Sequence, residues 1–250
     1  MRKLVLLASL CATVYGRDLL STASDWEWRG TVLRGRSVQI RGVTGDIHAV
    51  ASASGQVEVS ARIHDQGEVD MHVTDGGSGV TVCAVRKGAA MCADNPLAAP
   101  GSRVDYEVRV PAGVHLVART VNGGIAVESL TSDVSAETVN GAVEISTTGT
   151  AQAKTVNGSI RACLLKPFWK KSPEFSAVNG GISVNIPKNV TAGVRAETRN
   201  GRIVSQVSNF RGTETEHTLD GTIGRGGGGG AGNGLVIRTI NGTIELKQPF

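Results

Sequence analysis

The heptapeptide KTVNGSI, from Lys154 to Ile160, has two near-copies earlier in the chain, RTVNGGI from Arg119 and ETVNGAV from Glu137. An Asn-Gly pair is typical of a two-residue hairpin turn. Asn and Gly also stand together in nucleotide-binding loops, in glycosylation sites and in structural repeats. The number and spacing of the copies distinguish these interpretations.

The motif recurs seven times, at steps of 17 to 22 residues. Gly follows the aligned position in every copy, Ile or Val stands three residues after it, and Thr stands two residues before it in six of the seven. The aligned residues are Asn122, Asn140, Asn157, Asn179, Asn200, Asp220 and Asn241. A fixed period of this length is typical of a structural repeat rather than of a repeated active site.

Alternation within each copy predicts two strands joined at the Asn-Gly pair. Ala stands four positions before the Asn in four copies, Thr stands two positions before it in six, and a polar residue stands between these positions in all seven, which is the period of a strand with one buried face. An antiparallel meander would not require Thr and Ile at one register in every copy, whereas a parallel stack places equivalent residues above one another. We therefore expect an all-β, single-chain parallel β-solenoid of about seven TVNG-type coils, with Asn and Gly in positive-φ or otherwise unusual corner conformations.

The chain divides into three sections in this interpretation. Residues 1–16 are expected to be a signal peptide, because a basic start precedes a short apolar stretch and small residues end at Gly16. Residues 17–111 form a β-rich section that starts and caps the solenoid, and residues 112–250 carry the repeats. We expect Trp26 and Trp28 to cover the end of the core, although stacking on sugar rings is an alternative.

Export follows from the signal peptide, with the periplasm, the cell surface or the extracellular space as the destination. No later stretch is apolar enough for a transmembrane helix. In an oxidising compartment, Cys83 and Cys92 are expected to form a disulfide across the short loop between them, and Cys163 is expected to remain a free thiol. No metal site is expected, because the spacing is not C-x-x-C and no His pair accompanies it.

Composition and motifs give little support for catalysis or for nucleic-acid binding. The formal net charge is +4, scattered along 250 residues without a long basic run. The glycine run at 224–234 lacks the Gly-Lys-Ser/Thr ending of a phosphate loop, and no catalytic motif occurs. We expect no cofactor and no enzymatic activity. A carbohydrate-active enzyme with paired carboxylates on a β-helix is the main alternative.

One insertion between repeats interleaves aromatic and basic side chains. The residues are Lys166, Phe168, Trp169, Lys170 and Lys171. This combination suits anionic glycans or anionic lipid head groups. The alternative is a loop whose two aromatic residues pack on the flank of the solenoid.

The segment YEVRVPAGVHLVARTVNGGIAV, from Tyr106 to Val127, is followed by serial TVNG repeats and preceded by the expected signal peptide. In this pattern the chain resembles the bacterial putative-adhesin family of β-strand-repeat domains, over roughly residues 35–246. The resemblance implies a parallel β-solenoid on an exported or envelope-associated protein, and it implies no catalytic residues. The expected function is a non-enzymatic adhesive or structural envelope module, with surface glycans, anionic lipids or other envelope proteins as partners. An envelope-stress module that binds anionic lipid or glycan is a further alternative.

Overall fold

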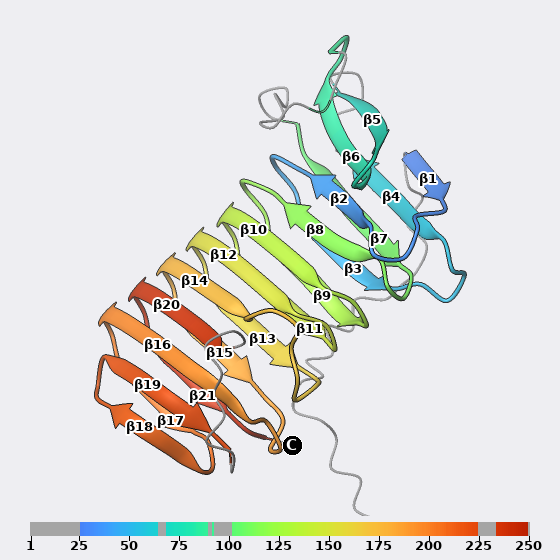
Figure 1. Cartoon of the computed structure of the whole chain (residues 1–250). Helices are drawn as coiled ribbons and strands as arrows, with labels where there is room; N and C mark the ends of the chain where they lie inside the picture. The colour runs from blue at the N-terminus through green and yellow to red at the C-terminus, as the bar shows by residue number, and fades with distance from the viewer. Residues whose placement is uncertain (1–25, 65–68, 90–91, 93–101, 225–233, 250) are drawn as a thin grey trace, which may run out of the picture.

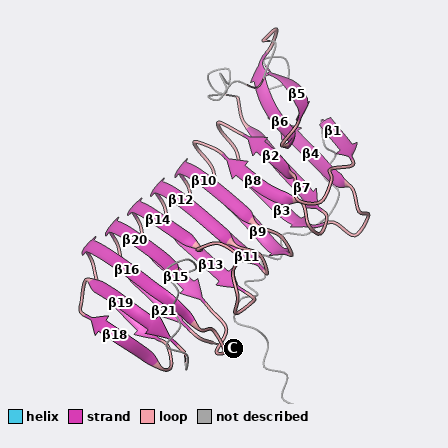
Figure 2. Cartoon of the chain, in the orientation of Figure 1, coloured by secondary structure: helices cyan, strands magenta, loops and turns pink. Residues whose placement is uncertain are grey.

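The computed structural model of the chain describes residues 26–64, 69–89, 92, 102–224 and 234–249. All the regular structure in these residues is β-strand, and no helix occurs among them (Figure 2). The strands form two sheets, one of ten strands, here sheet A, and one of eleven, here sheet B. The predicted all-β class is therefore confirmed, and the expected signal peptide at 1–16 lies outside the described residues.

Sheet A has the spatial order β1 (Trp26–Gly30), β4 (Val57–Ile63), β7 (Val104–Val110), β3 (Ile47–Ala51), β9 (Ile125–Leu130), β11 (Val143–Thr147), β13 (Ile160–Leu164), β15 (Ile182–Asn185), β21 (Ile244–Lys247) and β17 (Ile203–Gln206). Sheet B has the order β18 (Phe210–Glu214), β19 (Thr218–Ile223), β16 (Ala192–Asn200), β20 (Leu235–Asn241), β14 (Glu174–Asn179), β12 (Ala151–Asn157), β10 (Val134–Asn140), β8 (His115–Arg119), β2 (Ser37–Arg41), β6 (Gly79–Arg86) and β5 (Val69–Gly76).

The middle of the molecule is a stack of coils, each made of one strand of sheet B, a corner and one strand of sheet A (Figure 1). Neighbouring coils pair in parallel and in register. In sheet B, Ala136 lies beside Ala153 and Asn140 beside Asn157. In sheet A, Val143 lies beside Ile160. The inward residues of both sheets meet in one apolar core.

Both ends of the stack are antiparallel, so the expectation of a wholly parallel structure is wrong there. At the N-terminal end, β4 pairs antiparallel with β1 and β7, and β5 pairs antiparallel with β6. At the C-terminal end, β19 pairs antiparallel with β16 and β18. Trp26 and Trp28 in β1 are half-buried and pack against the core. A hairpin on each end covers strand edges that the repeats would otherwise expose.

The coils do not stack in the order of the sequence. The coil of β20 and β21 comes last in the chain, but β20 lies between β14 and β16, and β21 lies between β15 and β17. In Figure 1, β20 is the dark red strand between two orange ones. The chain therefore runs through the coil at 192–206 and the hairpin at 210–223 before its path returns to the interior of the stack.

Asp220 is not a corner, contrary to the sequence expectation. It lies within β19, opposite Arg195 of β16 and Thr213 of β18. The glycine after it is explained by the antiparallel packing, because a Cβ on Gly221 would lie 2.8 Å from the Cα of Gly212. Six coils thus share the Asn corner, and in spatial order their residues are Asn122, Asn140, Asn157, Asn179, Asn241 and Asn200.

The corner asparagines form a continuous ladder of side-chain amides. Asn157 donates its Nδ2–H to Oδ1 of Asn140 at 2.8 Å, and its own Oδ1 accepts from Asn179 at 2.9 Å. The inserted coil continues the ladder, because Asn241 donates to Asn179 at 2.7 Å and Asn200 donates to Asn241 at 2.8 Å. All these bonds run in one direction along the stack.

The Thr and Gly of the motif meet between adjacent coils. Thr155 is buried and donates its hydroxyl hydrogen to the carbonyl oxygen of Gly141 at 3.0 Å, and Thr138 does the same to Gly123 at 2.9 Å. None of the six corner glycines has a positive φ, so the positive-φ alternative for the corner is wrong. Glycine is required because a Cβ on Gly158 would lie closer than 3.0 Å to the backbone of Gly141, and the other corner glycines are equally crowded.

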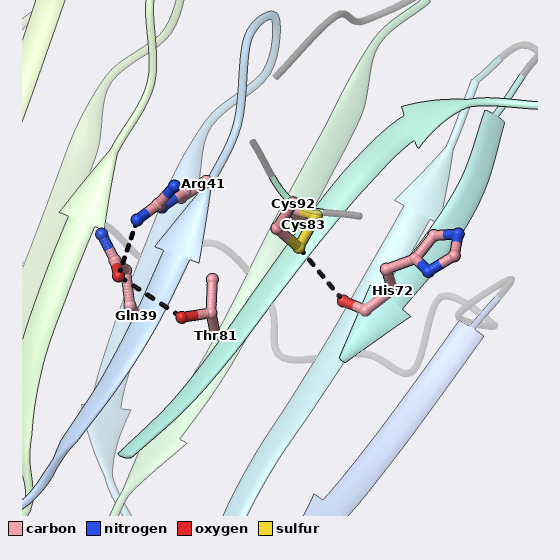
Figure 3. Close-up of a disulfide and its surroundings, with 6 residues drawn as sticks. All are labelled: Gln39, Arg41, His72, Thr81, Cys83 and Cys92. Atoms are coloured by element: carbon pink, nitrogen blue, oxygen red, sulfur yellow. Dashed lines mark hydrogen bonds between the residues drawn. A yellow bond between two sulfur atoms is a disulfide. The ribbon is translucent and has the colours of Figure 1, made fainter. Parts of the chain in front are cut away.

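Cys83 and Cys92 form a disulfide with a Cα–Cα distance of 5.9 Å, as the sequence led us to expect (Figure 3). Cys83 is fully buried in β6. The bridge therefore ties Cys92 to β6, near the end of sheet B. The described part of the chain contains no free cysteine, so the expectation of a free thiol at Cys163 is wrong.

Candidate functional site

The loop at residues 165–173 connects β13 to β14 on the edge of the stack opposite the Asn ladder. Backbone hydrogen bonds fix both of its ends. The N–H of Leu165 donates to the carbonyl of Thr147 at 2.9 Å, and the carbonyl of Pro173 accepts from Val236 at 3.0 Å. The loop is therefore an excursion held at its base by the neighbouring coils.

The two aromatic residues of this loop have opposite environments. Trp169 is only 6% exposed and belongs to the apolar core, whereas Phe168 is 78% exposed, the highest value among the exposed large apolar residues. The packing interpretation of this loop thus fits Trp169, and the binding interpretation fits Phe168. Trp169 anchors the loop, and Phe168 is presented to solvent.

Three lysines of the loop lie within three residues of Phe168 in the sequence. Lys166, Lys170 and Lys171 are all exposed. Among the described residues, no acidic side chain lies within ion-pair distance of them. Lys188 is also exposed, and it stands in the corresponding loop of the coil of β15, which pairs with β13. Sequence reasoning did not select Lys188, because only the stacking order relates the two loops.

Charged residues on the sheet faces are paired more often. Arg119 lies 3.0 Å from Glu137, and Arg161 lies 3.3 Å from Glu144 in the next coil. These pairs neutralise each other across neighbouring strands. Because no described acidic side chain pairs with Lys166, Lys170 or Lys171, these lysines leave a local excess of positive charge on the loop.

A second charged cluster lies at the N-terminal end of the stack. Asp105 contacts Arg103 at 3.0 Å, His64 at 2.8 Å and the backbone N–H of Asp46 at 2.9 Å. Burial opposes the charge of Asp105, but the hydrogen bonds from Asp46, His64 and Arg103 outweigh it, so the pKa of this carboxyl is lowered. Asp46 in turn accepts the N–H of Gly124 at 2.7 Å. This network ties two coils and serves a structural role.

Two surface hollows among the described residues do not resemble a glycosidase site. One is lined by Arg161, Ser183 and Glu245, and the other by Val32, Arg34 and Pro111. Glycoside hydrolysis generally needs two carboxyl groups about 5 to 9.5 Å apart. Neither hollow has more than one acidic residue in its lining. No group of His, Cys, Asp and Glu suited to a metal ion occurs in the described part of the chain.

A narrow row of apolar side chains runs beside the Asn ladder, on the edge of the stack opposite the loop at 165–173. The residue before each corner Asn points outward, and Val139, Val156 and Ile240 are 38 to 40% exposed. These side chains stand on neighbouring or nearby coils. Arg199 interrupts the row in the coil of β16.

Comparison with known proteins places the chain near solved structures only. No family model and no curated protein matches. A structure of a putative cell adhesion protein from Clostridium sporogenes is similar at 11% identity, with 89% of this chain and 99% of that chain covered and a TM-score of 0.49. A putative adhesin from Bacteroides fragilis is similar at 11% identity, with 88% and 96% covered and a TM-score of 0.34. Both structures are described as adhesion proteins, and the sequence resemblance was also to a putative-adhesin family.

None of the described segments is a helix that is long and apolar enough to cross a membrane.

Proposed function

We propose that the protein is an exported, non-enzymatic binding module, a flattened β-solenoid that attaches to anionic surfaces through the loop at 165–173. The observation that carries the proposal is the exposed ring of Phe168 in a loop with three exposed lysines, none of which pairs with an acidic side chain of the described residues. Buried Trp169 supports it, because a loop anchored in the core presents its neighbouring side chain in a fixed position. The resemblance to the adhesin family agrees with attachment to a surface.

The chemistry at this loop combines attraction with burial of an apolar group. Each lysine near an anionic lipid surface contributes about 1 kcal/mol. Burial of a Phe side chain contributes about 1.5–3 kcal/mol. A single loop would therefore bind weakly, with an association constant of order 10³–10⁴ M⁻¹. Stable attachment would need several copies, or a second contact in the same surface.

Absence of catalysis is part of the proposal. It is supported by the lining of the two hollows, neither of which contains a pair of carboxylates. Hydrolysis of an anionic polysaccharide by the purified chain would contradict this part and would leave the binding part in place.

Sedimentation with vesicles tests the binding site. We expect the folded chain to bind vesicles that contain anionic lipid and to bind them less as salt is raised, with no binding to neutral vesicles. Phe168→Ser, or the replacement of Lys166, Lys170 and Lys171 by Ser, should abolish binding. A parallel titration with soluble anionic polysaccharide separates lipid from glycan, because only insertion of Phe168 requires a bilayer.

Two variants serve as matched controls. Leu33→Ser removes another exposed apolar side chain, 60% exposed, and Lys154→Ser removes an exposed lysine on the face of β12. Both should bind as the unmodified chain does. Equal binding by the Phe168 variant and the Leu33 variant, with both folded, would overturn the assignment of the site.

A further inference from the structure

The coil of β20 and β21 occupies a slot inside the stack. Every strand of this coil has a parallel neighbour on both sides. These neighbours are β14 and β16 in sheet B, and β15 and β17 in sheet A. In the sequence, this coil follows the coil at 192–206 and the hairpin at 210–223, although both lie beyond it in the stack.

The walls of the slot make the same contacts as any two neighbouring coils. Asn179 and Asn200 continue the amide ladder on either side of Asn241. The hydroxyl of Thr239 donates to the carbonyl of Gly180, and that of Thr198 donates to the carbonyl of Gly242, each at 2.9 Å. Backbone pairing and motif contacts therefore hold the coil, and such contacts are the same whichever chain supplies it.

The walls are also complementary to each other. Asn179 and Asn200 stand at the same register, as do Gly180 and Gly201. A slot that lost its coil would therefore present two edges that match a TVNG-type coil, and a chain could close them or accept a new coil. Unpaired edges of this kind are templates for strand addition.

Two side chains make contacts particular to this coil. The guanidinium of Arg238 lies between Glu174 of β14, at 3.8 Å, and Glu197 of β16, at 3.7 Å. Gln248 donates from Nε2 to the carbonyl of Pro187 at 3.2 Å, and its Oε1 accepts the N–H of Ser208 at 2.6 Å. The slot thus recognises a coil with a basic residue in sheet B and an amide side chain after sheet A.

We infer that the coil at 235–247 is transferable, and that two copies of the chain exchange it reciprocally to form a dimer. Each copy would place its coil in the slot of the other, which fills both slots and leaves neither slot with an unpaired edge. Eleven residues, most of them glycine, separate Ile223 from Leu235. A connection of this length can span at most about 40 Å, which permits transfer to a neighbour. The inference does not depend on the function of the loop at 165–173.

Disulfide trapping in the full chain tests the exchange. Ser183 of β15 and Glu245 of β21 are register partners on the outer face of sheet A. One preparation carries Ser183→Cys and a second, of different mass, carries Glu245→Cys. The two are mixed, refolded together from denaturant at high protein concentration and then oxidised. We expect a disulfide-linked heterodimer whose cross-linked peptide joins positions 183 and 245.

The same row of sheet A supplies the matched control. Glu144 of β11 and Arg161 of β13 are register partners in coils that follow each other in the sequence. A mixture of Glu144→Cys and Arg161→Cys chains should give only background heterodimer. A single chain with both Ser183→Cys and Glu245→Cys should give an internal disulfide at low concentration, which shows that the substitutions permit folding and insertion.

The outcomes separate cleanly. Heterodimer in the 183–245 mixture well above the 144–161 mixture, and its suppression by a synthetic peptide of residues 234–248, would support transfer. A 183–245 mixture that stays at the level of the 144–161 mixture, while the double variant forms its internal disulfide, would overturn it.

Discussion

Replacement of Gly158 by Ala should destabilise the protein severely, because two coils approach each other there without room for a side chain. The new Cβ would lie 2.5 Å from the carbonyl carbon of Gly141 and 3.2 Å from the N of Ala142. Carbon atoms in favourable contact are about 3.5–4.0 Å apart, so the coils would have to separate by roughly 1 Å.

The cost follows from the hydrogen bonds at that level of the stack. Gly141 donates to Asn157 at 3.0 Å, Val143 donates to Ser159 at 2.9 Å, and Thr155 donates to Gly141 at 3.0 Å. Loss of three such bonds, at about 1 kcal/mol each, lowers the free energy of unfolding by about 3 kcal/mol. For a chain of this size, that corresponds to a decrease in Tm of roughly 6–12 °C.

Thermal unfolding followed by circular dichroism measures the effect, and Gly124→Ala is the control. Gly124 stands one position further along its own corner, where other coils carry Ala142 or Ser159. A Cβ there would lie 3.4 Å from the nearest atom, the carbonyl oxygen of Ala142. Its Tm should stay near that of the unmodified chain. Equal melting of the Gly158 and Gly124 variants would refute the argument from close approach.

Three further predictions concern other parts of the stack. Thr155→Val keeps the shape of the side chain but removes a buried donor to Gly141, so the free energy of unfolding from urea denaturation should fall by about 1 kcal/mol. Asn157→Asp removes the donor to Asn140 and places a carboxylate against its Oδ1, so the variant should melt lower at pH 7 and recover part of the loss at pH 3, where a protonated carboxyl can donate. Because the pKa of Asp105 is lowered in the folded state, its stabilisation is complete above the ordinary carboxylate range and is lost as pH falls through the folded-state pKa. Asp105→Asn should therefore reduce the decline in stability that denaturation curves show between pH 5 and pH 2, and an unchanged decline would contradict this assignment.

Periodicity in the sequence was sufficient to predict the strands of the repeats, their inward residues and the alignment of the Asn residues. Ala118, Ala136 and Ala153 are buried as the alternation predicts, and the Asn residues align because parallel strands keep one register. The exception at Asp220 was also visible in principle. Four residues before it stands Glu216, a charged residue where every true coil places an apolar side chain in the core. An ionised Asp also has no N–H with which to continue an amide ladder.

The order of the coils could not be predicted, because the motif contacts are the same between any two neighbours. The charges of Arg238, Glu174 and Glu197 identify their relation only after the stacking order is known. The candidate site had the same limitation. Phe168 and Trp169 are adjacent and both aromatic, and only the three-dimensional path of the loop decides which one enters the core.

The inserted coil has a mechanical consequence for the proposed role in surface attachment. A tension that enters the chain at Lys247 acts on β21, which is hydrogen-bonded on both flanks, and then on β20, which is also bonded on both flanks. Four ladders resist in shear together, whereas a coil at the end of the stack would be peeled from a single neighbour on each sheet. Because this coil lies in the interior of the stack, the strands that carry the tension must break all four pairings together rather than one hydrogen bond after another.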